Sequence, residues 1–228
     1  MLSVDRTLNP IDQIIRNRRS VRGFLPRPVP DEVLHEVFAV AQSAPSNCNV
    51  QPWLMHVVSG DACEALRARL VAAGGTLEGA SPDFPADGKF HGVYRERQYD
   101  TAARLYGAMG VARDDLAGRH AAYLRNQAFF GAPHAAFLFL PEPFGIREAT
   151  DCGMYAQTLM LAMTARGIAS CAQGALSLYP DIVRAHLGIP AEQRLLLGIS
   201  FGYEDPDVPA NAARVGRAAL DANVRFHR

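Results

Sequence analysis

The sequence predicts an α+β fold, with a central, mostly antiparallel sheet flanked by helices in a single domain over residues 1–228. Helical patterns dominate the chain, and its four strand-like apolar runs lie well apart from one another. A regular βαβ alternation is therefore not indicated, and no G-x-G-x-x-G motif follows any of the four runs. With 49% apolar residues among 228, the chain can bury a sizeable core.

The N-terminal half is expected to hold three helices, one strand and a long loop. Isoleucines at helical spacing predict the first helix, an acidic, proline-led start predicts the second, and Asp61 can cap the third. These elements are helices over residues 10–18, 30–42 and 61–73 and a strand over 53–58. Residues 74–92 are rich in Gly, Pro and Asp, so we expect a loop there, which begins a lid over about 74–106.

The C-terminal half is expected to supply four helices and the other three strands. The helices are predicted over residues 93–109, 114–130, 148–166 and 179–187, and the strands over 132–140, 168–173 and 195–203. The helix over 148–166 is the most apolar, and Gly167 is its expected C-cap. A tail over 204–228 begins with Pro and Asp and then becomes basic.

Charge and composition argue against several classes of function. The 23 basic residues are balanced by 23 acidic ones, so the chain lacks the basic excess of a general nucleic-acid-binding protein. No apolar run approaches the roughly 18 residues that span a membrane, and no signal segment is visible, so we expect a soluble, cytoplasmic protein. The seven histidines are scattered and the four cysteines form no C-x-x-C pair, so we expect no metal site.

Two basic stretches, one near each end, are candidates for binding an anion. The segment RNRRSVRGF, Arg16 to Phe24, holds four arginines and one serine within seven residues. Guanidinium groups bind phosphate in bidentate fashion, and a hydroxyl adds a further donor. A solvated helix end, favoured by the helix dipole, is an equal alternative. Arg214 and Arg217 of the tail could join the same phosphate, or could belong to a surface arm.

The stretch SAPSNCNVQPW, between the second helix and the first strand, is unusually rich in short polar side chains. Asn and Gln can donate and accept at once, which suits the edge of a heteroaromatic ring such as the flavin pyrimidine. An Asx-rich turn is the alternative and explains Pro45, Ser46 and Asn47. It explains Asn49 and Gln51 poorly, because alternate residues of an extended segment point the same way.

The stretch CAQGAL, Cys171 to Leu176, is the last candidate site segment. Gly174 would let the backbone approach a flat ligand closely, and a backbone N–H here could serve a redox centre. An ordinary strand-to-helix turn is the alternative, and this stretch alone would favour it. Cys171 has no local base, so we interpret it as structural.

Five stretches together resemble the nitroreductase family of flavin enzymes. In chain order they are RRSVRGF, APSNCNVQPW, NQAFFGAPH, GIASCAQGALSLYPDIVRAHLGIP and GISFGYEDPDVPANAARVGR, so the resemblance covers about residues 10 to 220. It implies a nitroreductase-like sandwich with FMN as cofactor and NAD(P)H as electron donor. It also implies a homodimer whose subunits exchange their C-terminal extension.

The resemblance assigns residues around FMN in three groups. Near the phosphate and ring edge it places Arg18, Arg19, Ser20, Arg22, Arg214 and Arg217; against the flavin, partly from the other subunit, Pro45, Ser46, Asn47, Asn49 and Gln51; and near the reactive N5, Ala172, Gln173 and Gly174. The backbone of Gly174 faces N5 in this interpretation, and no side chain is expected to be catalytic, since the flavin carries the hydride chemistry. Cys48 and Gln173 depart from the commoner family residues and leave the substrate class open.

The implied activity is hydride transfer from NAD(P)H through flavin to nitroaromatic or quinone-like acceptors, in a ping-pong cycle. Phe84, Phe90, Tyr94 and Tyr99 of the lid could stack on an aromatic acceptor. A reductive dehalogenase or flavin-fragmenting enzyme of the same family is one alternative. A non-catalytic flavin-binding protein is another. No motif ranks NADH against NADPH.

Overall fold

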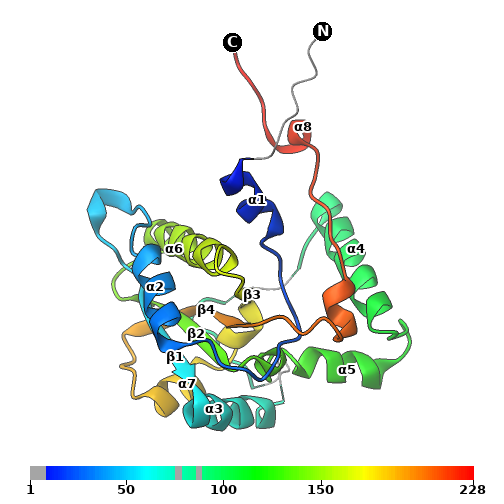
Figure 1. Ribbon diagram of the computed structural model, residues 1–228, viewed down its shortest axis with the longest axis horizontal. Helices are drawn as coiled ribbons and strands as arrows, with labels where there is room; N and C mark the ends of the chain where they lie inside the picture. The colour runs from blue at the N-terminus through cyan, green and yellow to red at the C-terminus, as the bar shows by residue number, and fades with distance from the viewer. Residues whose placement is uncertain (1–8, 75–78, 86–88) are drawn as a thin grey trace.

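The computed structural model describes residues 9–74, 79–85 and 89–228, which form an α+β arrangement around one sheet (Figure 1). Its strands are β1 (Leu54–Ser59), β2 (His134–Pro141), β3 (Ala169–Gln173) and β4 (Gln193–Gly202). They lie in the order β1-β2-β4-β3, and each neighbouring pair is antiparallel. The predicted fold class and antiparallel sheet are thereby confirmed.

Helices surround the sheet at positions close to those predicted. They are α1 (Pro10–Asn17), α2 (Asp31–Ala41), α3 (Gly60–Ala72), α4 (Gly92–Ala108), α5 (Leu116–Leu124), α6 (Ile146–Thr164), α7 (Pro180–Leu187) and α8 (Leu220–Asn223). Short 3-10 turns are η1 (Asn47–Asn49), η2 (Phe129–Gly131), η3 (Gly174–Ser177) and η4 (Pro209–Ala212). In the part of the chain that the structure describes, no helix is long and apolar enough to cross a membrane.

Two local predictions are wrong. The helix expected over 114–130 ends at Leu124, and the chain then turns through η2, where Phe129 and Phe130 both have φ of 54°. A right-handed helix cannot continue through a positive φ, and the burial of both rings holds this turn in place. Asp61 does not cap α3, because Ser59 occupies the N-cap and Asp61 lies in the first turn, where its charge favours the helix dipole.

Strand β2 lies between two apolar cores. Ala135, Phe137 and Phe139 belong to the core shared with α3 and α7, whereas the residues between them belong to the core shared with α2 and α6. Figure 1 shows these two helix pairs on opposite faces of the sheet. A strand covered on both faces is apolar throughout, which explains why this run shows no polar alternation.

The segment after α1 runs along the edge of the sheet where β3 lies. The Val21 N–H donates to the Ser170 carbonyl at 3.1 Å, and the Leu25 N–H donates to the Tyr203 carbonyl at 2.9 Å. Figure 1 shows α1 and the C-terminal segment projecting from the same side of the molecule. The fold therefore brings the two basic stretches of the sequence next to each other.

His134, at the start of β2, is a buried polar group that joins three elements. The Val29 N–H donates to its Nε2 at 2.9 Å, so Nδ1 carries the proton and donates to Ser59 Oγ at 2.6 Å. The imidazole also stacks on Phe201, with ring centroids 5.2 Å apart. Burial lowers the pKa of His134, and the charge on Asp31 partly opposes this effect.

This imidazole predicts a pH dependence of stability. Because the folded pKa of His134 lies below the ordinary value of 6.5, the unfolded chain binds the proton first as the pH falls. The contribution of His134 to the free energy of unfolding is complete above pH 6.5 and is lost below it. The loss is at most about 1.4 kcal/mol per pH unit.

Urea unfolding, followed by circular dichroism between about pH 5 and about pH 8, measures this effect. His134→Gln should reduce the slope of unfolding free energy against pH. His120→Gln, at an exposed position, should keep the wild-type slope. An identical slope in the wild type and in His134→Gln would contradict the assignment to His134.

Candidate functional site

A cavity of about 880 Å³ opens between the two ends of the chain. It is lined by α1 and the segment after it, by Thr101 of α4, by Gln157 of α6 and by residues 213–217. The arginines that line it are Arg16, Arg18, Arg19, Arg22, Arg214 and Arg217. The volume lies within the range of small-molecule sites, and this concentration of positive charge is suited to an anion.

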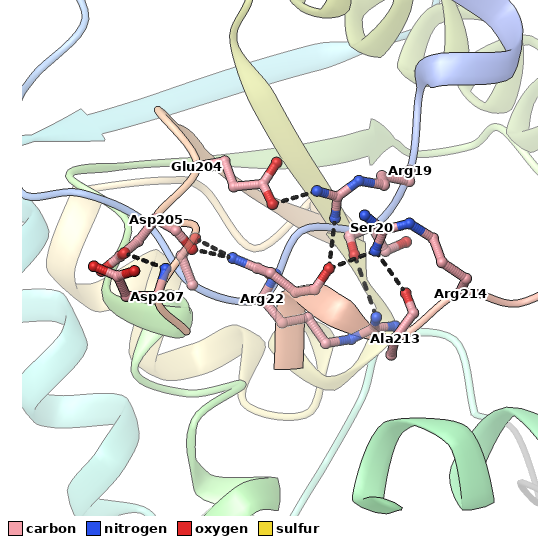
Figure 2. Close-up of polar contacts among 10 residues, drawn as sticks. Arg19, Ser20, Arg22, Glu204, Asp205, Asp207, Ala213 and Arg214 are labelled. Carbon is pink, nitrogen blue, oxygen red and sulfur yellow. Dashed lines mark hydrogen bonds and ion pairs between the residues drawn. The ribbon is translucent and has the colours of Figure 1, made fainter. Parts of the chain in front are cut away.

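The arginines are held mostly by backbone carbonyls rather than by carboxylates. Arg19 pairs with Glu204, and Figure 2 shows this contact next to Ser20 and Arg214. Arg22 Nη1 donates to the Ser20 carbonyl at 3.3 Å, and Arg214 Nη1 donates to the Ala213 carbonyl at 3.1 Å. Among the described residues, Arg19 alone of the six is ion-paired, so most of the positive charge in the cavity is not balanced by carboxylates.

The pKa of Arg18 shows the effect of placing several arginines around one cavity. Burial lowers the pKa of its guanidinium, and the positive charge of Arg217 lowers it further. A bound phosphate would relieve the repulsion and accept bidentate hydrogen bonds from the guanidinium groups. The donors present therefore fit the phosphate group of FMN.

The first residues of β3, beside the arginine cluster, include a buried hydroxyl group that lacks a hydrogen bond among the described residues. Ser20 pairs with Ser170 in an isolated β-bridge, and the buried Oγ of Ser170 has no hydrogen-bond partner within the described ranges. A buried hydroxyl without a partner is a place where a ligand or an ordered water would complete the bonding. Cys171 follows, and burial raises the pKa of its thiol, opposed by the charge of Arg22, which agrees with a structural role.

The end of β3 offers its backbone to a ligand. The Gln173 side chain turns inward, where Nε2 donates to the Asn126 carbonyl at 3.1 Å and Oε1 accepts from Ser200 Oγ. Ala172 and Gly174 are exposed, and a Cβ placed on Gly174 would meet no atom within 4 Å. A flat ligand can approach this backbone, whereas the Gln173 side chain points inward and is already hydrogen-bonded to Asn126 and Ser200.

The polar loop after α2 does not reach the cavity of its own chain, since none of residues 45–51 lines it. The Asn47 N–H donates to Asp151 Oδ2 at 3.2 Å, close to the start of α6. Figure 1 shows this loop beside that end of α6, away from the C-terminal segment. Within one chain, the predicted ring-contacting residues and the predicted phosphate-binding residues are therefore apart.

The expectation of an extended segment at Asn49 and Gln51 is wrong. The backbone forms η1, with φ of 49° at Cys48, 56° at Asn49 and 52° at Gln51. Gln51 Nε2 donates to the Asn49 carbonyl at 3.0 Å, and its N–H donates to Ser46 Oγ at 2.9 Å. Positive φ at residues other than glycine costs about 1–3 kcal/mol each and is concentrated at functional sites. The strained turn presents exposed polar side chains at a defined place.

The family model for the nitroreductase family matches residues 15–203. The chain belongs to the nitroreductase family. It is 49% identical over 221 residues to nitroreductase NfnB of Mycolicibacterium smegmatis, covering 95% of this chain and 92% of that protein. It is 33% identical to a chloronitrobenzene nitroreductase of Comamonas testosteroni, covering 95% of this chain and 96% of that one.

A solved structure agrees with the sequence relatives. The FMN-dependent nitroreductase NfnB from Mycobacterium smegmatis, in complex with NADPH, matches with a TM-score of 0.91 at 48% identity. The match covers 95% of this chain and 97% of that chain. The resemblance drawn from the five sequence motifs and the nitroreductase-like fold are both confirmed. The region matched by the family model contains the first arginine stretch, the polar loop and Gly174, and it stops before Arg214 and Arg217.

In this family member, the predicted lid is only partly described, because residues 75–78 and 86–88 lie outside the described ranges. Phe84 is not free to stack on an acceptor, since it packs on the α2–α6 core with the Arg194 guanidinium 4.8 Å from its ring centroid. Phe90, Tyr94 and Tyr99 are exposed. A second cavity of about 640 Å³, between α4 and the C-terminal segment, adjoins the first and shares Thr101, Val215, Gly216 and Arg217 with it.

Eight of the residues that line this cavity were not predicted as site residues, and Arg16, Gln157 and Thr101 are three of them. Arg16 belongs to the arginine stretch but matches no position of the family motif. Gln157 carries an exposed amide in α6, the most apolar helix. Because a polar residue interrupts the apolar pattern there, the sequence could have indicated it as a candidate site residue. Thr101 stands in a helix without buried residues, where no pattern distinguishes it from its neighbours.

Arg18→Ala is expected to weaken FMN binding, because a half-buried phosphate partner is lost. One charged hydrogen-bond partner contributes about 1.5–3 kcal/mol, so the dissociation constant should rise roughly ten- to a hundredfold. Quenching of flavin fluorescence on titration measures this constant. Arg113→Ala, an exposed position outside the cavity lining, serves as the control and should bind as the wild type does. If Arg18→Ala binds FMN as tightly as the wild type does, Arg18 does not bind the phosphate.

Proposed function

We propose that this protein is a cytoplasmic, FMN-dependent nitroreductase that uses NADPH to reduce nitroaromatic compounds. The observation that carries the proposal is the cavity lined by six arginines from both chain ends, of which Arg19 alone is ion-paired among the described residues. A related structure is named as FMN-dependent and holds NADPH, which favours NADPH over NADH. Relatives named for chloronitrobenzene and 4-nitrobenzoate favour nitroaromatic acceptors over quinones.

Different residues of this chain would bind the phosphate and the ring of the cofactor. Arg18, Arg19, Arg22, Arg214 and Arg217 bind the phosphate, and the Ser20 hydroxyl adds a donor. The open backbone at Ala172 and Gly174 would face the flavin ring, and the Gly174 N–H would be available as a hydrogen-bond donor to it. Bound FMN supplies the hydride-transfer chemistry between NADPH and the acceptor. No acid–base side chain of the protein is needed for that step.

We further propose that the site is completed in a homodimer. Pro45, Ser46, Asn47, Asn49 and Gln51 lie outside the cavity of their own chain, so a partner chain would bring its copy of this loop to the flavin. The C-terminal extension would be exchanged between the subunits.

Exposed apolar side chains at both chain ends support this assembly. Ile11 and Ile15 of α1 are 64% and 48% exposed, Leu220 of α8 is 65% exposed, and Phe226 is 72% exposed. Apolar side chains grouped on projecting segments mark an interface rather than a free surface. A second copy of the chain is the partner that would cover them.

The whole chain is proposed to act as a single domain, with a lid over about residues 74–106. In the described part of that segment, α4 lines both cavities and exposes Tyr94 and Tyr99, and Phe90 is exposed just before the helix begins. Arg97 lies over the Tyr94 ring and Arg95 over the Tyr99 ring, and the other faces of these exposed rings, with that of Phe90, would stack on a nitroaromatic acceptor above the flavin. The lid would thereby select planar, aromatic substrates.

The purified protein should be yellow or should become yellow on adding FMN, and NADPH oxidation should require a nitroarene. The absorbance spectrum and an NADPH oxidation assay measure the two properties. A colourless protein that takes up no FMN would overturn the cofactor assignment. Bound flavin without turnover would support a non-catalytic flavin-binding protein, and halide release from a halogenated aromatic would support a dehalogenase.

Mixing two defective chains should restore activity if the flavin site is shared. One chain carries Arg18→Ala with Arg217→Ala, and the other carries Asn49→Ala with Gln51→Ala. Each alone should be nearly inactive, whereas co-expression should give about a quarter of wild-type activity, from one intact site in each mixed dimer. Light scattering checks the dimer. A fully active monomer, or a mixture no more active than its parts, would contradict the shared site.

A further inference from the structure

Asn211 is a buried residue at the point where the C-terminal segment leaves η4, with only 4% of its surface exposed. Its Nδ2 donates to the carbonyls of Gly23 and Asp205 at 2.9 Å each, and its Oδ1 accepts from the Arg22 N–H at 2.7 Å. Both amide hydrogens and the amide oxygen are therefore bonded. The side chain ties the N-terminal arginine segment to the turn that precedes the tail.

The backbone of Asn211 adds contacts to two guanidinium groups. Its carbonyl accepts from Arg19 Nη1 at 3.4 Å and also from Arg214 Nη1. Figure 2 shows Arg19 and Arg214 near each other, on the same side of Arg22. One residue thus contacts Arg19, Arg22 and Arg214, which belong to the two stretches that line the basic cavity.

The packing around Gly23 makes this link rigid. A Cβ at Gly23 would lie 2.4 Å from Val208 side-chain atoms, so the Val208 side chain packs against the Gly23 backbone at a distance that only a glycine allows. The Asp205 N–H also donates to the Gly23 carbonyl at 3.1 Å. The segment at 22–23 and the turn at 205–211 therefore move together, with Asn211 at their junction.

We propose that Asn211 is a positioning residue for the phosphate site: it sets the N-terminal and C-terminal arginines at the separation that a single phosphate requires. This inference rests on the proposed function. Asn211 does not line the cavity, so it acts through the arginines rather than on the ligand. Bidentate binding of phosphate depends on the placement of each guanidinium fork, so displaced arginines lose affinity even when all of them are present.

The test compares FMN with riboflavin, which has the same ring but no phosphate. In Asn211→Ala, the dissociation constant for FMN should rise by about tenfold or more, while that for riboflavin should change by less than about threefold. Asn211→Ser keeps one neutral hydroxyl for the Arg22 N–H and should fall between the wild type and Asn211→Ala. This variant keeps the test available if Asn211→Ala does not fold.

A matched control separates positioning from stability. His134 does not line the cavity, and it is bonded to the Val29 N–H at 2.9 Å and to Ser59 Oγ at 2.6 Å. His134→Gln should lower the melting temperature without changing the ratio of FMN to riboflavin affinity. If the Asn211 variants lose both affinities equally, or neither, Asn211 is a structural residue only and the proposal is overturned.

A double-mutant cycle gives an independent readout. Arg214→Ala should weaken FMN binding strongly in the wild type but much less in the Asn211→Ala background, because Arg214 is already displaced there. Equal effects in both backgrounds would overturn the proposal. If the wild-type protein binds neither FMN nor riboflavin, the proposed function itself is wrong. If the wild type prefers FMN and the Asn211 variants bind FMN equally well, only the inference about Asn211 is wrong.

Discussion

Mutual repulsion among the guanidinium groups of the cavity is the constraint on which the rest of the structure depends. Arg18 and Arg217 come from segments far apart in the sequence, and burial together with the positive charge of Arg217 lowers the pKa of Arg18. Backbone hydrogen bonds hold the arginine segment in position despite this repulsion, from Val21 to Ser170 and from Leu25 to Tyr203. The free energy of packing both chain ends therefore maintains a site that is electrostatically unfavourable until an anion enters.

The sheet topology explains why that packing is possible. The order β1-β2-β4-β3 leaves β3 at an edge, and an edge strand offers unpaired backbone groups to another segment. The residues after α1 take up that edge through the bridge between Ser20 and Ser170. The same edge strand ends at Gln173, directly before Gly174, so the proposed phosphate-binding segment and the open backbone both contact β3.

Much of the fold was predictable from the sequence, because apolar periodicity governs where helices and buried strands form. The family motifs also identified most of the arginines around the cavity. What could not be predicted depends on tertiary packing: the positive φ of Phe129 and Phe130, the strained turn at Gln51, and Phe84 beneath Arg194. Asn211 was missed for a similar reason, since a single Asn among alanines shows no sign that it bonds to residues 188 to 192 positions away.

The joining of the two chain ends has a consequence for biosynthesis. Arg18 leaves the ribosome long before Arg214 and Arg217, and both groups line the cavity. A nascent chain therefore lacks part of the proposed phosphate site until Arg217 has been added. Loading of the proposed cofactor would follow the synthesis of Arg217, and a chain released before residue 214 would carry four of the six cavity arginines, without Arg214 and Arg217.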